Sequence, residues 1–136
     1  MDVVRHATKP VIFSHSNPLG VHAHKRNVGD QALRAIASTG GVVGINGTGI
    51  FLGRNDNSSE TVADHVDYVV QKIGIDHVGL GLDYAFDASE VDDFLRANPD
   101  VFPASEGFAD GIRMVAPEQL PEIVAILVGR GYRLAD

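Results

Sequence analysis

Two kinds of hydrophobic pattern alternate along the first part of the chain. Short continuous apolar runs bounded by Pro, Gly or Asn are typical of strands buried on both faces of a parallel sheet. These runs are Val11–Phe13, Gly41–Ile45 and His77–Leu82. Between them, apolar residues recur at helical spacing after Asn27 and again from Val62 to Ile73. The order strand, helix, strand, helix, strand predicts two successive βαβ units with right-handed crossovers.

Polar residues and glycines predict where the two helices begin and end. Asn27 is a good N-cap residue for the first helix, and Gly40 with Gly41 supplies its stop. Ser58 precedes the second helix, which we expect to end at Gly74.

The last third of the chain has a different pattern. An acidic helix is expected within residues 86–100, ending near Asn98, and residues 102–114 are typical of a loop. A final helix with an apolar stripe begins near Pro117 and ends at Gly129, although Pro121 makes its start hard to place.

The predicted elements do not add up to a finished fold. Three parallel strands have two open edges and apolar faces that need covering, and a (β/α)₈ barrel typically needs about 250 residues. The chain has 136 residues, beginning with what resembles the end of a helix at residues 2–7. We therefore expect residues 1–136 to form a single partial α/β domain, in preference to a complete small α/β binding module.

Composition excludes several classes of function. The hydrophobic content of 44% and charged content of 21% are typical of globular proteins. Eighteen acidic against eleven basic residues give a net charge of −7, which argues against nucleic-acid binding. Without cysteine the chain has no thiolate metal site and no thiol nucleophile. Neither a membrane segment nor a signal peptide is recognisable, which favours a cytoplasmic location.

Two polar residues follow predicted strands, where parallel α/β folds place reactive groups. His15 comes after the first strand, and imidazole is a common zinc ligand, but a polar residue that merely ends a strand is the simpler alternative. Asp83 follows the third strand, and its carboxylate could exchange a proton with a metal-activated water. A turn or helix-capping role for Asp83 is equally compatible with its position. Their equivalent positions favour a shared site.

The remaining candidates are weaker when judged on their own. Arg26 lies in the loop after the first strand, and a guanidinium can bind a substrate carboxylate through two hydrogen bonds, although an ordinary surface arginine has the same pattern. His22 and His24 form a His-x-His pair in the same loop, and we expect both to be exposed to solvent. His65 lies beside the apolar stripe of the second helix and is expected to be a packing residue.

Taken together, several strings resemble the renal (membrane) dipeptidase family of zinc peptidases, a branch of the amidohydrolase-type barrels. They occur in the family's order and cover nearly the whole chain. The strings are residues 10–18, 25–30, 40–46, 63–66, 77–83, 102–107 and 120–131.

The resemblance implies a specific fold and chemistry. Members fold as (β/α)₈ TIM-type barrels, and the strands here would be the sixth to eighth, forming about three βα units at the C-terminal end. Two Zn²⁺ ions and a metal-bound hydroxide hydrolyse dipeptides in this family. By motif match, His15 is a metal ligand on the sixth strand, Arg26 binds the substrate carboxylate, and Asp83 is the catalytic acid/base on the eighth strand.

The family's other metal ligands have no counterpart in this sequence. A His-x-Asp pair on the first strand, a bridging glutamate and a further histidine would all lie upstream of residue 1. We therefore expect a zinc dipeptidase segment that is inactive alone and has a small dipeptide as the substrate of its complete site. The alternative is a non-catalytic, truncated half-barrel that forms homo-oligomers through its open edges.

Overall fold

The computed structural model describes residues 2–135 and shows a mixed α/β fold. Two short strands, β1 (Val43–Ile45) and β2 (Val78–Leu80), pair in parallel, with Val43 opposite Val78. The predicted first strand is reduced to a single parallel bridge between Phe13 and Val43. Its backbone nevertheless follows β1, because Phe13 N–H donates to the carbonyl of Val42 at 3.0 Å.

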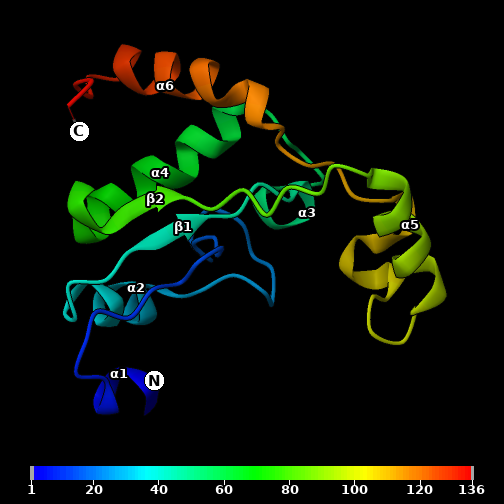
Figure 1. Ribbon diagram of the computed structural model, residues 1–136, viewed down its shortest axis with the longest axis horizontal. Helices are drawn as coiled ribbons and strands as arrows, with labels where there is room; N and C mark the ends of the chain where they lie inside the picture. Colours follow the sequence, from blue (N-terminus) through cyan, green and yellow to red (C-terminus); the bar gives the residue numbers. More distant parts are fainter. Residues whose placement is uncertain (1, 136) are drawn as a thin grey trace.

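Six α-helices are present within residues 2–135, together with short 3₁₀ turns (Figure 1). The helices are α1 (Asp2–His6), α2 (Asp30–Ala37), α3 (Gly49–Leu52), α4 (Ser59–Ile73), α5 (Ala88–Ala97) and α6 (Leu120–Gly129). The 3₁₀ turns are η1 (Ile75–His77), η2 (Ala104–Glu106), η3 (Phe108–Asp110) and η4 (Pro117–Gln119).

The hydrophobic core lies around α4. This helix packs against α2, α6 and both strands, and its inner face carries fully buried Val62 and Val69. Leu33 of α2 and Ile123 of α6 are likewise buried at 0% exposure. Each such aliphatic side chain contributes about 1.5–3 kcal/mol through its burial. The predicted apolar stripes of α2 and α4 therefore face the core, whereas that of α6 does so only in part, because Val124 is 44% exposed.

The strands differ in burial from each other. All residues of β1 are buried, as the sequence predicted, whereas Leu80 of β2 is 40% exposed. Leu80 is exposed because β2 is an edge strand: within residues 2–135, it pairs with β1 on one side and with no strand on the other.

One helix boundary and one additional helix differ from the sequence-based expectation. The residue that precedes α2 is Gly29, not Asn27, and Asn27 instead donates its side-chain amide to the carbonyls of His22 and Phe51. Helix α3 was not predicted, because its four residues are too few to show a helical period. The expected cap at α4 is confirmed, since Ser58 Oγ accepts the backbone N–H of Thr61.

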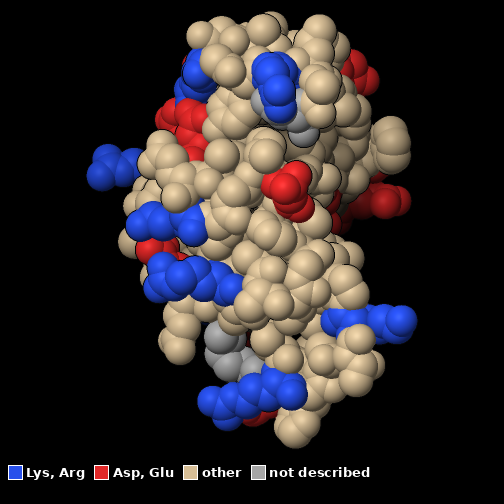
Figure 2. All heavy atoms as spheres, turned by 90° about the vertical axis from the view of Figure 1, so that its left-hand side faces the viewer, with Lys and Arg blue, Asp and Glu red and all other residues tan. Residues whose placement is uncertain are grey.

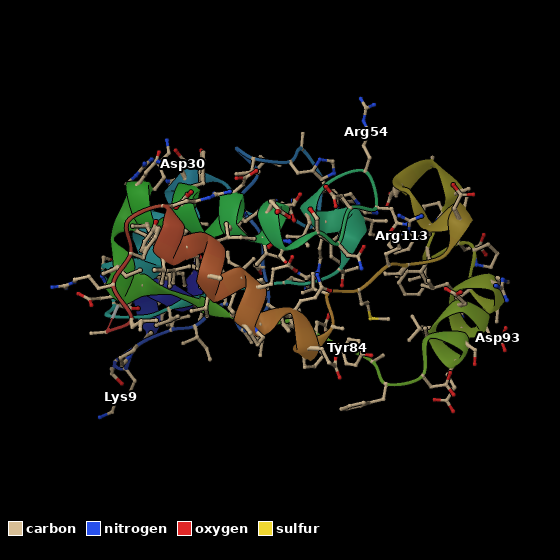
Figure 3. All side chains as sticks on the ribbon, turned by 90° about the horizontal axis from the view of Figure 1, so that it is seen from above. Lys9, Asp30, Arg54, Tyr84, Asp93 and Arg113 are labelled. Atoms are coloured by element: carbon tan, nitrogen blue, oxygen red, sulfur yellow. The ribbon has the colours of Figure 1, made fainter. Side chains whose placement is uncertain are left out.

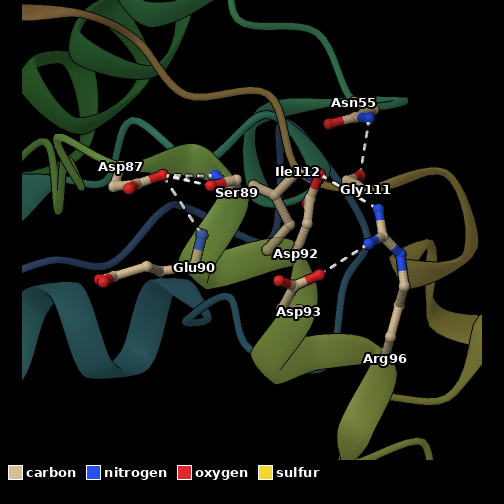
Figure 4. A network of polar contacts seen from close by, with 9 residues as sticks. All are labelled: Asn55, Asp87, Ser89, Glu90, Asp92, Asp93, Arg96, Gly111 and Ile112. Atoms are coloured by element: carbon tan, nitrogen blue, oxygen red, sulfur yellow. Dashed lines mark hydrogen bonds and ion pairs between the residues drawn. The ribbon is translucent and has the colours of Figure 1, made fainter.

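Residues 87–111, which we call the α5 excursion, extend away from the core (Figure 1). Asp87 caps α5 by accepting the backbone N–H groups of Ser89 and Glu90, and these hydrogen bonds, with the hydroxyl of Ser89 first, lower the pKa of its carboxyl group. Asn55 donates to the carbonyl of Gly111 at 3.1 Å, which connects the end of the excursion to the core (Figure 4).

Surface features add little to this picture. None of the helices within residues 2–135 is long and apolar enough to cross a membrane. On the face shown in Figure 2, Lys and Arg side chains are interspersed with Asp and Glu side chains.

Candidate active site

The three segments that carry polar strand-end residues run in the same direction and end at the same edge. Phe13 and Val43 form a parallel bridge, and β1 pairs in parallel with β2. The Ser14 carbonyl lies so close to Gly81 that a Cβ atom there would overlap it. His15 and Asp83 therefore follow segments whose backbones are in contact.

Tyr84 lies toward the end of the molecule that bears the α5 excursion, opposite Lys9 and Asp30 (Figure 3).

His15 is half-buried, and its ring is oriented by its neighbour. Ser14 Oγ lies 2.7 Å from His15 Nδ1, which leaves Nε2 as the nitrogen available to a ligand. A histidine that binds a metal through one ring nitrogen normally hydrogen-bonds through the other, and this arrangement has that form.

Arg26 is exposed and reaches back to the end of the His15 segment. Its Nη2 donates to the carbonyl of His15 at 3.3 Å, and its Nη1 lies 3.5 Å from Ser16 Oγ. The guanidinium carbon also lies 5.7 Å from the centre of the Phe51 ring in α3. The loop that carries Arg26 thus folds over the edge where His15 lies.

Asp83 has a left-handed backbone conformation, with φ of 57°. Its Oδ2 accepts a hydrogen bond of 3.2 Å from Nδ2 of Asn46. Asp83 does not cap a helix, because the cap of α5 is Asp87. Of the alternatives left open by the sequence, the capping role is therefore excluded.

Two buried asparagines connect the strand ends, and our sequence-based reasoning missed both. Asn17 and Asn46 are 0% and 1% exposed. Asn17 Nδ2 donates to the Asn46 carbonyl, and Asn46 N–H donates to Asn17 Oδ1, each at 3.1 Å. Their signal in the sequence was the same as that of His15 and Asp83, because each follows an apolar run at its C-terminal end.

The other histidines behave in different ways. His22 and His24 are half-buried, so the expectation that both are exposed is wrong: their rings stack, and His24 packs against Phe51 with ring centres 5.0 Å apart. Burial and the nearby His24 lower the pKa of His22. His65 is a fully buried packing residue, as predicted, and its Nε2 lies 2.8 Å from the carbonyl oxygen of Leu52.

The residues present fit a metal centre only in part. Within residues 2–135, no three side chains of His, Asp or Glu gather closely enough to hold a metal ion. His15 offers one free imidazole nitrogen, whereas a catalytic zinc usually has three protein ligands. No metal-dependent step can therefore be assigned to these residues alone.

Comparison with known proteins gives two relatives of interest. A protein encoded in the pqqA 5′ region of Klebsiella pneumoniae is 43% identical over 88 residues, covering 61% of this chain and 32% of the relative. A dipeptidase of Schizosaccharomyces pombe is 38% identical over 78 residues, covering 55% of this chain and 19% of the relative. The chain thus spans a third or less of the curated relatives that it matches.

Solved structures show the same relationship over nearly the whole chain. An amidohydrolase from Pseudomonas aeruginosa matches with a TM-score of 0.76 and 29% identity, covering 97% of this chain and 42% of that one. A metallopeptidase from Rhodobacter sphaeroides, solved with a phosphinate mimic of the dipeptide L-Ala-D-Ala, matches with a TM-score of 0.68 and 25% identity, covering 97% and 33%.

A family model described as membrane dipeptidase (peptidase family M19) matches residues 1–97. This match covers more than half of the chain and includes the segments of His15, Arg26 and Asp83. The chain therefore belongs to the membrane dipeptidase family.

Proposed function

We propose that residues 1–136 form one partial domain, the C-terminal part of a (β/α)₈ barrel that hydrolyses dipeptides with the help of zinc. In this proposal, the segment ending at His15, β1 and β2 are the sixth, seventh and eighth strands. The Phe13–Val43 bridge and the β1–β2 pairing support it, because they give three neighbouring parallel segments in chain order. The solved dipeptidase and metallopeptidase relatives, of which this chain spans about a third, also support it.

The observation that carries the proposal is the hydrogen-bonded edge from Arg26 to Asp83. Arg26 donates to the His15 carbonyl, and Asp83 accepts from Asn46, which Asn17 binds in turn. One edge thereby carries three groups that the proposed chemistry needs. They are a nitrogen that can bind a metal, a cation for the substrate's carboxylate, and a carboxylate that can accept a proton.

Each residue has a distinct role in the proposal. A zinc ion bound at the complete centre would supply a Lewis acid for the scissile carbonyl and for a water molecule. His15 Nε2 supplies one ligand, and Ser14 holds the ring through Nδ1. Arg26 binds the carboxylate of the dipeptide, and Asp83 accepts a proton from the attacking water and returns it to the leaving amine. The other zinc ligands come from outside this sequence, so we expect residues 1–136 alone to be inactive.

The test is dipeptide hydrolysis in the presence of zinc by the natural polypeptide that contains this chain. His15→Ala and Asp83→Ala should each lower kcat/KM at least about 100-fold. The matched control is His6→Ala, because His6 is an exposed histidine on α1. Activity that survives both site substitutions would overturn the assignment.

A second candidate function, self-association without catalysis, is favoured by one surface. An apolar groove of about 220 Å³ lies between α4, β2 and α6, and three of its lining residues are 40–44% exposed. They are Leu80, Val124 and Val128. Light scattering of the 136-residue chain distinguishes the candidates: a dimer weakened by Val124→Glu supports self-association, and a monomer at all concentrations excludes it.

A further inference from the structure

We propose that Asn46 is a positioning residue that orients the carboxyl group of Asp83 for its role as proton acceptor, and that Asn17 in turn fixes Asn46. This inference rests on the proposed function, because it names a residue that the proposed proton transfer requires. Neither asparagine is a metal ligand in the proposal. Their effect on the chemistry is exerted through the carboxylate.

The position of Asn46 is fixed by the strand before it and by Asn17. Asn46 directly follows β1, and Asn17 binds both its backbone N–H and its backbone carbonyl through one side-chain amide. Buried amides are costly to leave unpaired, so this double hydrogen bond strongly favours a single conformation. Asn46 is therefore a rigid support at the centre of the strand-end edge.

The orientation of the Asn46 amide is fixed as well. Its Oδ1 accepts the backbone N–H of Thr48 at 2.6 Å, and a backbone N–H can only donate. The amide oxygen must therefore face Thr48, which turns Nδ2 toward Asp83, where the two atoms lie 3.2 Å apart. If the amide were reversed, Nδ2 would face the N–H donor of Thr48, and Oδ1 would face the carboxylate of Asp83.

An N–H donor discriminates between the two forms of a carboxyl group. It binds an ionised carboxylate oxygen more strongly than the carbonyl oxygen of the neutral acid, and it offers no acceptor to a carboxyl O–H. Asn46 thus fixes the orientation of the Asp83 carboxyl group. The backbone around Asp83 is also fixed, because Gly47 N–H donates to the carbonyl of Leu82 at 2.9 Å.

The sharpest variant is Asn46→Asp, which has nearly the same shape. It keeps an oxygen for Thr48 N–H but replaces the donor facing Asp83 by a second carboxyl group. Two neighbouring carboxyl groups do not both ionise easily, so one retains a proton to higher pH. In the active dipeptidase we expect kcat to fall at least about 10-fold and the acidic limb of the kcat/KM profile to move up by about one pH unit or more. KM should change less than about twofold, because Asn46 does not contact the substrate in the proposal.

The matched control is Asn57→Asp. Asn57 also donates its side-chain amide to a neighbour, the carbonyl of Met114 at 2.9 Å, and it has no hydrogen bond to Asp83. This control should leave the pH profile unchanged, even where it lowers stability. An unchanged profile in Asn46→Asp would overturn the positioning role.

A measurement without catalysis separates this inference from the proposed function. In ¹H–¹⁵N spectra of the 136-residue chain, the side-chain amide of Asn46 should shift when the carboxyl group that it contacts takes up a proton on acidification. In Asp83→Asn this response should disappear, while that of Asn57 stays as in the wild type. If Asn46 responds identically in both proteins, the contact is absent and the inference is overturned, whatever the activity. If the contact is present but the natural polypeptide lacks dipeptidase activity, it is the proposed function that fails, and the catalytic role of Asn46 fails with it.

Discussion

The guanidinium of Arg26 lies over the ring of Phe51, with 5.7 Å between the guanidinium carbon and the ring centre. His24 packs against the same ring, and its Nδ1 accepts the backbone N–H of Arg26 at 3.1 Å. The position of the exposed Arg26 side chain therefore depends on α3 as well as on the loop that carries it.

Under the proposed role of Arg26 in binding the substrate carboxylate, Phe51→Leu should weaken substrate binding with little change in the chemical step. A cation–π contact at an exposed site is worth about 0.5–1 kcal/mol, so we expect KM for a dipeptide to rise roughly two- to fivefold at nearly constant kcat. Steady-state kinetics of the active dipeptidase measure both constants.

A dipeptide amide, which lacks the carboxylate, is the matched substrate control and should show no such rise. Phe94→Leu is the control variant, because the Phe94 ring packs against Phe102 within the α5 excursion. An equal loss for the amide would show that Phe51 acts on something other than the orientation of Arg26.

Mild acid should destabilise the fold through His65. Burial lowers the pKa of this histidine below its ordinary value of 6.5, whereas in the unfolded chain it stays near 6.5. As the pH falls through this range, the unfolded state binds the proton first, so the free energy of unfolding decreases until the folded-state pKa is reached.

Urea unfolding at several pH values between about 5 and 7 measures this slope. His65→Gln keeps an amide donor for the carbonyl of Leu52 but does not titrate, so it should have a shallower slope than the wild type. His22, whose pKa is also lowered, contributes in the same direction in both proteins. An unchanged slope in His65→Gln would contradict the buried, neutral state of this ring.

Helices α2, α4 and α6 could be predicted from sequence because each has an apolar stripe, and α5 because its end is recognisable. Ser58 and Gly74 bound α4 as expected, and Asn98 follows α5. The first strand could not be predicted correctly, because an apolar run such as residues 11–13 shows which residues avoid water but not how many pair in a sheet. The exposure of Leu80 was missed for the same reason, since pairing on the second edge of β2 is not encoded in its own residues.

Close backbone approach at Gly81 gives a stability prediction. A Cβ atom at this position would overlap the carbonyl of Ser14, whereas one at Gly79 would lie 3.5 Å from Val42 Cγ1, an ordinary contact. Gly81→Ala should therefore cost about 1–3 kcal/mol of unfolding free energy, and Gly79→Ala should stay within about 1 kcal/mol of the wild type. Urea denaturation of the two variants measures the difference. Equal stabilities would mean that the Ser14 and Gly81 backbones are further apart than described.

The candidate site was only partly accessible to sequence reasoning. His15 and Asp83 stood out because their side chains suit metal and proton chemistry, and both follow apolar runs. Asn17 and Asn46 occupy equivalent positions but carry neutral amides, which are also common in turns. Their hydrogen bonds join residues 29 and 37 positions apart in the chain. Pairings at such separation depend on the fold and leave no local pattern.

The C-terminal end of α6 provides a prediction for alkaline pH. Burial, together with the hydrogen bond to Asp67, raises the pKa of Tyr132 to about 12, above the ordinary value of 10. Its hydroxyl donates to Asp67 Oδ1 at 2.7 Å, while Arg130 contacts the other oxygen of the same carboxylate. Because the folded-state pKa is raised, this phenol favours folding below about pH 10, and its contribution is lost as the pH rises toward 12.

Ultraviolet titration of phenolate formation tests this directly. Subtracting the titration curve of Tyr132→Phe from that of the wild type should leave the absorbance change of a single phenol, with a midpoint near 12. Asp67→Asn should bring this midpoint closer to 10, because it removes the negative charge that opposes ionisation. The control is Asp76→Asn, since Asp76 lies in η1 and has no hydrogen bond to Tyr132. If the phenol in this difference curve titrates near 10, the Tyr132 hydroxyl is exposed to solvent, and Tyr132 does not pack against Asp67 of α4.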